Sequence, residues 1–228
     1  MSARALKLVI FDCEGTLVDS QLAVVSAMTA AWRALGLDDP DPILVRRVIS
    51  LPLKEAINAL LPTEDPLVAK RLAGLFRDAF YREHHQDGHQ REPLFSGMRE
   101  VLEALRATGC KLGIATGKSR QGLLTTLEDH GILDWFVTLQ TADCCDGKPA
   151  PDMVYRALEE SGVAAADSVV IGDTTYDIEM ALAAGVPSIG VAWGYHEVRD
   201  LKAAGAGRIV YHCGEIIPAV LDVSDVRR

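Results

Sequence analysis

The chain has 228 residues, of which 49% are hydrophobic and 24% charged, and its formal net charge is −9. This composition is typical of a folded protein and excludes a disordered chain. An acidic chain without a basic run has no electrostatic footprint for nucleic acid or an anionic membrane, and no apolar stretch approaches the ~20 residues of a membrane span. The five cysteines are odd in number and form no CxxC pair, which indicates reduced thiols in a cytoplasmic protein.

The first predicted strand spans residues 6–11 and is followed by a long stretch without a convincing strand. Ser20 is a plausible helix N-cap, and the prolines Pro40 and Pro42 interrupt the pattern that follows it. Helical spacing of apolar residues is seen over 22–35, 53–61 and 67–84. We therefore expect an all-helical domain over residues 20–91, inserted after the first strand, with hinges at Ser20 and within 86–93.

Strands and helices alternate in the remainder of the chain. Further strands are predicted over 111–115, 136–139, 168–171, 188–191 and 208–211. Helices are predicted over 96–108, 119–130, 151–161 and 174–184, several of them ending before a glycine. This alternation predicts the α/β class, with a doubly wound, Rossmann-like parallel sheet. Residues 1–19 and 92–228 would form this core domain.

Two acidic residues, Asp12 and Glu14, follow the first predicted strand. In extended backbone, residues two apart point to one side, so these carboxylates are predicted to converge and to repel each other unless a cation lies between them. The carboxyl ends of strands are where open α/β sheets place their sites, and Gly15 permits a sharp turn. The alternative is a strand end with solvated acids.

A second acidic pair, Asp173 and Asp177, follows the strand predicted over 168–171. The two residues are one helical turn apart and would lie on the same face of the next helix. The alternative is a capping acid, in which Asp173 accepts hydrogen bonds from the N–H groups of Thr175 or Tyr176.

Thr116, Gly117 and Lys148 are candidates for binding a phosphate. Thr116 and Gly117 lie between a strand and a helix, which presents a hydroxyl and backbone N–H groups to an anion. Lys148 stands just before a helix that starts with proline and is a candidate fixed cation, although most lone lysines are surface residues.

Together these segments indicate one site at the edge of the sheet. Three carboxylates, a hydroxyl and a lysine around one point fit Mg²⁺-dependent phosphoryl transfer. Mg²⁺ prefers oxygen ligands, and it offsets the repulsion between an anionic nucleophile and an anionic phosphate.

With these motifs in this order, the sequence resembles the haloacid dehalogenase superfamily. It resembles in particular the phosphatases with a helical cap, and among them those similar to phosphoglycolate phosphatase. Residues 12–20 (DCEGTLVDS) resemble the first motif, Thr116 the second, Lys148 the third and residues 172–177 the fourth. The resemblance covers the whole chain, and the helical insertion lies where that family has its cap.

The resemblance implies a role for each matching residue in catalysis. Asp12 would attack phosphorus and form an aspartyl-phosphate, and Glu14 would protonate the leaving alkoxide and then activate water. The phosphoryl oxygens would be held by Thr116, Gly117 and Lys148.

The resemblance also implies a bound Mg²⁺. Its ligands would be Asp12, the backbone carbonyl of Glu14 and Asp173, with Asp177 supporting them. The helical insertion would close over the substrate, exclude water and select the leaving group.

Glu14 departs from the family pattern, which has Asp at this position. The metal role uses only the backbone carbonyl and is unaffected, but glutamate is one methylene longer, and proton transfer requires a reach of about 2.6–3.2 Å. We therefore expect Mg²⁺ and phosphate binding with slower turnover. A degenerate member that only binds a phosphorylated ligand is one alternative.

Two enzymatic alternatives also stay open. One is a phosphomutase similar to beta-phosphoglucomutase, against which Thr16 argues modestly, because mutases of that group often have Val there. The other is a metal-independent 2-haloacid dehalogenase, against which Glu14, Asp173 and Asp177 argue.

The expected substrate is a small phosphorylated metabolite, of the phosphoglycolate or sugar-phosphate type, with nucleotides and pyrophosphate left open. The expected assembly is a monomer or a weak homodimer. Lys118 and Arg47 are candidate substrate contacts, with a solvated surface charge as the preferred interpretation. His196 is a candidate for substrate contact or capping. The cluster of His84, His85 and His89 near the predicted hinge has no assigned role, and a metal site there is the less favoured interpretation.

Overall fold

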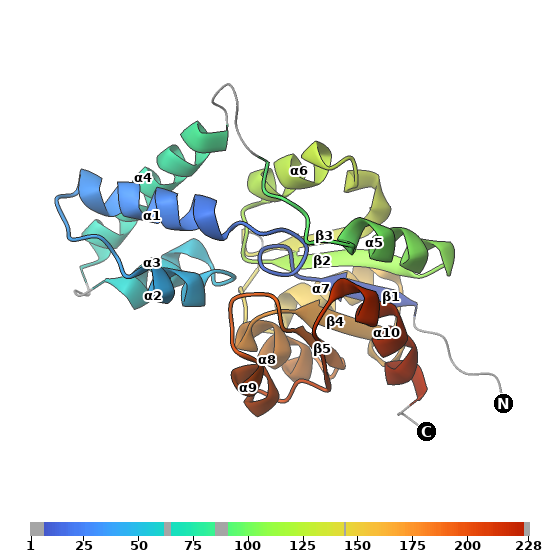
Figure 1. Cartoon of the computed structure of the whole chain (residues 1–228). Helices are drawn as coiled ribbons and strands as arrows, with labels where there is room; N and C mark the ends of the chain where they lie inside the picture. The colour runs from blue at the N-terminus through green and yellow to red at the C-terminus, as the bar shows by residue number, and fades with distance from the viewer. Residues whose placement is uncertain (1–6, 62–64, 85–90, 144, 226–228) are drawn as a thin grey trace.

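The computed structural model describes residues 7–61, 65–84, 91–143 and 145–225 (Figure 1). Its centre is a six-stranded sheet in the order β3-β2-β1-β4-β5-β6, in which every neighbouring pair is parallel. The strands are β1 (Leu8–Phe11), β2 (Lys111–Thr116), β3 (Phe136–Thr141), β4 (Ser168–Gly172), β5 (Ser188–Val191) and β6 (Arg208–Val210). The order reverses direction between β1 and β4, which is where open α/β sheets form a crevice at their carboxyl ends.

Helices cover both faces of this sheet, and this explains the nearly continuous apolar runs of the central strands. In β1, Val9 and Phe11 pack on one face, whereas Leu8 and Ile10 pack on the other. The first face is covered by α5 (Met98–Ala107), α6 (Arg120–Asp129) and α10 (Ile216–Asp225). The second face is covered by α7 (Asp152–Ser161), α8 (Thr175–Ala183) and α9 (Val198–Ala203).

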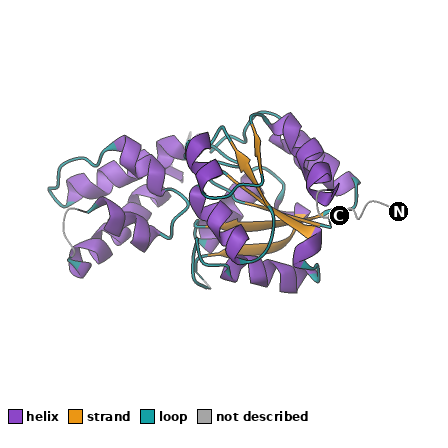
Figure 2. Cartoon of the chain, turned by 90° about the horizontal axis from the view of Figure 1, so that it is seen from below, coloured by secondary structure: helices purple, strands orange, loops and turns teal. Residues whose placement is uncertain are grey.

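Four helices form a separate unit between β1 and α5 in the chain. These are α1 (Gln21–Ala34), α2 (Pro42–Val48), α3 (Leu53–Leu60) and α4 (Pro66–His84). They have a hydrophobic cluster of their own, which includes Met28, Trp32, Ile57 and Leu72. Figures 1 and 2 show this helical unit projecting from one side of the sheet, and β1 runs toward it. The carboxyl ends of the strands therefore face the helical unit.

The parallel sheet and the inserted helices confirm the predicted fold class. The helical pattern is interrupted between Ala34 and Pro42, as expected, but the sequence analysis missed α2, in which Pro42 is the first residue and its missing N–H costs nothing. The Asp41 side chain caps this helix by accepting a hydrogen bond from Ile43 N at 2.8 Å. Sequence periodicity also missed α9 and α10. Across the described residues, no helix combines the length and apolarity needed to cross a membrane.

Two predicted features fall partly outside the described residues. The proposed hinge over 86–93 is described only from residue 91 onward. His85 and His89 also lie outside the described part of the chain, as does the side chain of His84.

Candidate active site

Three buried carboxylates gather at the carboxyl edge of the sheet. Asp12 directly follows β1, Asp173 follows the neighbouring strand β4, and Asp177 lies in the first turn of α8. One oxygen from each lies within 4.8 Å of the others, and each residue is at most 1% exposed. The structure therefore brings together residues that the sequence separates by about 160 positions.

Lys148 is the cation of this cluster. Its Nζ lies 2.7 Å from Asp12 Oδ1 and 2.6 Å from Asp177 Oδ1, and the residue is only 2% exposed. Burial disfavours the charged ammonium, but the charges of Asp12 and Asp177 more than offset it, so the pKa of Lys148 is raised. The interpretation of Lys148 as a surface lysine is therefore wrong.

The cluster carries an excess of negative charge. Burial and the charge of Asp177 raise the pKa of Asp12 to about 6, although the positive charge of Lys148 acts in the opposite direction. Burial and the two neighbouring carboxylates raise the pKa of Asp173 well above its usual range. Three carboxylates and one ammonium in a dry site are complementary to a further cation. Because the donors are all oxygen atoms, the set fits Mg²⁺ rather than a metal that prefers thiolate or imidazole.

Asp173 is held in place by two hydrogen bonds from distant segments. Its Oδ1 accepts from Thr16 Oγ1 and its Oδ2 accepts from Tyr195 N, both at 2.9 Å. Gly15 has φ +85°, and a Cβ on it would lie 2.3 Å from Asp173 Oδ2. Only glycine fits this turn, so the loop after β1 can pack directly against the acid.

Thr174, and not Asp173, caps α8. Thr174 Oγ1 accepts from Asp177 N at 3.4 Å, while Asp177 Oδ2 accepts from Thr174 N at 3.0 Å, which completes a capping box. His196 Nδ1 accepts from Thr175 N at 3.1 Å, so His196 also caps this helix. The capping interpretation of Asp173 is therefore wrong, and its carboxylate is available to the cluster.

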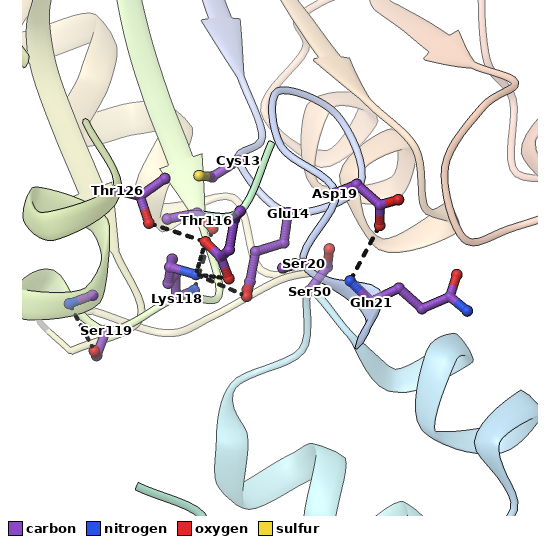
Figure 3. A network of polar contacts seen from close by, with 12 residues as sticks. Cys13, Glu14, Asp19, Ser20, Gln21, Ser50, Thr116, Lys118, Ser119 and Thr126 are labelled. Carbon is purple, nitrogen blue, oxygen red and sulfur yellow. Dashed lines mark hydrogen bonds and ion pairs between the residues drawn. The ribbon is translucent and has the colours of Figure 1, made fainter. Parts of the chain in front are cut away.

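Glu14 is not part of this carboxylate cluster, and its side chain points toward Lys118 (Figure 3). Its Oε1 lies 3.2 Å from Lys118 Nζ, which also binds both carboxylate oxygens of Glu92 at 3.1 and 3.0 Å. The expected convergence of Asp12 and Glu14 is not seen, because the chain bends at residue 13 instead of staying extended. Asp12 is joined by Asp177 instead.

Lys118 is buried, so its interpretation as a solvated surface charge is also wrong. It is 6% exposed and lies between two carboxylates, and Thr126 Oγ1 donates to Glu92 Oε2 at 3.1 Å. Burial disfavours the ammonium, but the charges of Glu14 and Glu92 more than offset it, and the pKa of Lys118 is raised. Arg47, by contrast, is exposed as expected, and its carbonyl oxygen lies 2.9 Å from His196 Nε2.

Thr116 and Gly117 lie at the end of β2, beside β1. Thr116 is fully buried, and its Oγ1 accepts a hydrogen bond from Lys118 N at 3.2 Å. A Cβ on Gly117 would lie 2.5 Å from the carbonyl oxygen of Ser50 in the helical unit. The helical unit is thus in direct contact with this loop.

Ser50 reaches the carboxylate cluster from the helical unit, and the sequence analysis missed it. Its Oγ donates a hydrogen bond of 2.9 Å to Asp12 Oδ2. Ser50 has φ +82°, and among the described residues it is the only one other than glycine with positive φ. A non-glycine residue in this region is strained, and such strain is concentrated at functional sites. No motif marks Ser50 or Glu92, because both act through contacts with residues far away in the sequence.

A cavity of about 850 Å³ opens between the helical unit and the sheet. Its wall includes Glu14, Ser50, Gly117 and Lys118, so it begins beside the carboxylate cluster. A buried cluster of oxygen donors at the carboxyl edge of a parallel sheet, next to a cavity, is the arrangement of an enzyme that handles an anionic substrate.

The comparisons with known proteins agree with this arrangement. The family model described as haloacid dehalogenase-like hydrolase matches residues 9–191. A probable phosphatase, IndB, of Dickeya dadantii (strain 3937) is 38% identical over 216 residues, covering 93% of this chain and 92% of that protein. A phosphoglycolate phosphatase of Vibrio vulnificus (strain YJ016) is 27% identical over 226 residues, which cover 97% of this chain and 99% of that protein. The crystal structure of a predicted phosphatase from Clostridium acetobutylicum is 25% identical with a TM-score of 0.85, covering 96% and 99%.

The chain belongs to the haloacid dehalogenase-like hydrolase family. This confirms the resemblance found in the sequence and the prediction that the chain is an enzyme, a phosphatase of this family.

Proposed function

We propose that the chain is a Mg²⁺-dependent phosphatase that hydrolyses a small phosphorylated metabolite through an aspartyl-phosphate on Asp12. The observation that carries the proposal is the buried cluster of Asp12, Asp173 and Asp177 around Lys148. Asp12 is the acid that follows the central strand β1, and it is the acid that the helical unit touches through Ser50.

The reaction would proceed in two displacements at phosphorus. A carboxylate oxygen of Asp12 forms a bond to phosphorus while the bond from phosphorus to the ester oxygen breaks, and that oxygen takes a proton from Glu14. A water molecule then attacks phosphorus and returns a proton to Glu14, so that phosphate leaves and Asp12 is restored. Thr116, Gly117 and Lys148 would hold the phosphoryl oxygens and stabilise their charge.

Asp12 needs one free oxygen for this attack. Its Oδ1 accepts from Cys13 N at 2.6 Å and lies 2.7 Å from Lys148 Nζ, whereas its Oδ2 has Ser50 Oγ at 2.9 Å. Ser50 belongs to the helical unit, so separation of that unit from the sheet would free Oδ2 and admit the phosphate. We therefore propose that residues 20–91 act as a cap that opens for the substrate and then closes to exclude water.

The carboxylate cluster would hold the Mg²⁺ through Asp12, Asp173 and the backbone carbonyl of Glu14, with Asp177 orienting its neighbours. Bound there, the ion would neutralise the excess negative charge and allow an anionic nucleophile and an anionic phosphate to approach. Hydrogen bonds from Thr16 and Tyr195 already orient Asp173 for this role.

The name of the Vibrio relative suggests phosphoglycolate as one substrate to test. We further propose that the protein acts in the cytoplasm as a monomer or a weak homodimer. The acidic net charge of −9 argues against a nucleic-acid partner.

A second candidate is a slow member that mainly binds a phosphorylated ligand. The observation that favours it is the ion pair of Glu14 with Lys118, because a side chain held by Lys118 is not free to turn toward the ester oxygen. Replacement of Glu14 by Asp shortens the side chain and weakens this pair, so Glu14→Asp should increase turnover if the pairing limits the rate.

The decisive experiment measures hydrolysis of p-nitrophenyl phosphate with Mg²⁺ and with a chelator. We expect Mg²⁺-dependent release that disappears in Asp12→Asn, and a phosphorylated chain that borohydride reduces at residue 12. Retained Mg²⁺ binding without hydrolysis in the parent protein and in Glu14→Asp would instead support the binding role. Unchanged activity in Asp12→Asn would refute the proposed nucleophile.

A further inference from the structure

The cavity next to the carboxylate cluster is large for the smallest substrates of a phosphatase. Its volume of about 850 Å³ is in the upper part of the ~300–1,000 Å³ range typical of sites for ligands of drug size. A two-carbon acid would leave most of this space filled with water and would contact few of the side chains around it. The cavity therefore fits a substrate whose leaving group is much larger than glycolate.

One wall of the cavity is aromatic and aliphatic. Phe76 and Phe80 of α4 have stacked rings, with centroids 5.6 Å apart and an interplanar angle of 24°. Met28 and Val24 of α1 continue this wall. Rings and aliphatic side chains of this kind favour a flat, unsaturated group, which stacks on an aromatic face with an offset or edge-on geometry.

This aromatic wall begins where the leaving group would depart. The Phe80 ring centroid lies 5.1 Å from Lys118 Nζ, which is itself 3.2 Å from Glu14 Oε1. Glu14 is the residue proposed to donate a proton to the ester oxygen. A group attached to that oxygen would therefore lie along α4 as soon as the phosphate reached Asp12.

The charges of the cavity wall argue against a second anionic group on the substrate. Its acidic residues are Glu14, Glu55, Asp78, Asp143 and Asp146. Its cationic residues are Lys54, Arg77 and Lys118. The single positive charge of Lys118 is already shared by two carboxylates, so it would attract a third anionic group only weakly. A carboxylate or a second phosphate on the leaving group would therefore meet a wall with more negative than positive charge.

We propose that the substrate is a phosphate monoester of an uncharged alcohol that carries a flat, unsaturated ring, and that Phe76 and Phe80 bind this ring. The inference rests on the proposed phosphatase function and deepens it by naming the class of leaving group. Nucleosides and substituted pyridines both have the required chemistry, and separate arms of the test distinguish them.

The test compares alkyl phosphate monoesters, so that intrinsic reactivity stays similar. The ring-bearing substrates are uridine 5′-monophosphate and pyridoxine 5′-phosphate. Neither of the other two has a ring: the leaving group of glycerol 3-phosphate is uncharged, and that of 2-phosphoglycolate carries a carboxylate. With Mg²⁺ present, we expect kcat/KM for the better ring-bearing substrate to exceed that for 2-phosphoglycolate at least tenfold, with glycerol 3-phosphate between them. A kcat/KM for 2-phosphoglycolate equal to or above that of both ring-bearing substrates overturns the inference but leaves the phosphatase intact. Absence of Mg²⁺-dependent hydrolysis of every substrate overturns the proposed function.

Phe76→Leu tests the wall without disturbing the contact between Phe80 and Lys118. We expect it to raise KM for the ring-bearing substrate about fivefold and to leave KM for glycerol 3-phosphate unchanged. Tyr211→Leu is the matched control, because Tyr211 is an exposed aromatic residue after β6, away from the cavity. An equal change of KM for both substrates in Phe76→Leu overturns the assignment of the ring to this wall.

Discussion

Replacement of Lys118 by methionine tests whether the buried group of Glu14, Lys118 and Glu92 is one coupled electrostatic unit. The parent protein has one ammonium between two carboxylates, and the three residues are 8%, 6% and 6% exposed. Methionine keeps the unbranched shape and most of the length of the side chain but removes the charge, so two buried carboxylates are left without their shared cation. Breaking a buried ion pair in this way typically costs about 3–5 kcal/mol, and we expect Lys118→Met to lower the free energy of unfolding by this amount.

The effect of Glu92→Gln on the free energy of unfolding is predicted to have opposite signs in the parent protein and in Lys118→Met. In the parent protein it removes one of two carboxylates bound to Lys118 and should cost about 1.5–3 kcal/mol, as for a hydrogen bond to a charged group. In the Lys118→Met background the same change relieves the repulsion between the Glu92 and Glu14 carboxylates, which no longer share an ammonium, and should raise the stability. Coupling of this kind is expected only for residues in direct contact.

The assay is urea unfolding followed by circular dichroism for the two single variants and the double variant. Lys202→Met is the control, because Lys202 is an exposed lysine of α9 and its loss should change the free energy of unfolding by less than about 0.5 kcal/mol. A cost below about 1 kcal/mol for Lys118→Met, or the same cost of Glu92→Gln in both backgrounds, would show that water solvates these charges and that the reasoning is wrong.

Three further changes test the cluster and the contact of the helical unit. Asp173→Asn keeps the shape of the side chain but removes one carboxylate. It should therefore abolish thermal stabilisation by Mg²⁺ and lower kcat at least ~100-fold. Full stabilisation by Mg²⁺ in this variant would contradict the proposed ligand set. In the metal-free protein, the pKa of Asp12 is raised to about 6 from 3.8, so the folded state binds the proton more tightly than the unfolded chain. The stability should therefore fall by on the order of 3 kcal/mol as the pH rises from about 4 to above 6, and a flat metal-free profile in urea unfolding would count against this. Gly147→Ala would place a Cβ 2.2 Å from Pro52 Cγ and should lower kcat/KM by disturbing closure of the helical unit. Gly74→Ala in α4 meets open space and should leave kcat/KM unchanged, and equal losses in both alanine variants would refute the closure argument.

Local sequence patterns determined the fold class and most of the elements. Apolar runs ending in acids located β1 and β4 to within one or two residues, because strands buried on both faces need nearly continuous apolar residues. The same local logic missed α2, because proline ends a helical pattern but also fits the first residue of the next helix, as Pro42 does.

The sequence also marked the residues that the sheet brings together, namely Asp12, Lys148, Asp173 and Asp177. Each stands next to a strand or a helix start, and parallel strands necessarily place their carboxyl ends at one edge. Their positions in the chain were therefore enough to predict that they would meet.

Only the tertiary structure decided what each charged group faces. Lys118 pairs with both Glu14 and Glu92, and Ser50 reaches Asp12 from the helical unit, through contacts that join residues from 26 to 104 positions apart. Lys118 was assigned to the surface because lysine usually lies there, and only packing shows that two carboxylates hold it inside. Such pairings depend on the direction of side chains and on how the helical unit packs against the sheet. Neither produces a periodic pattern in the amino-acid sequence.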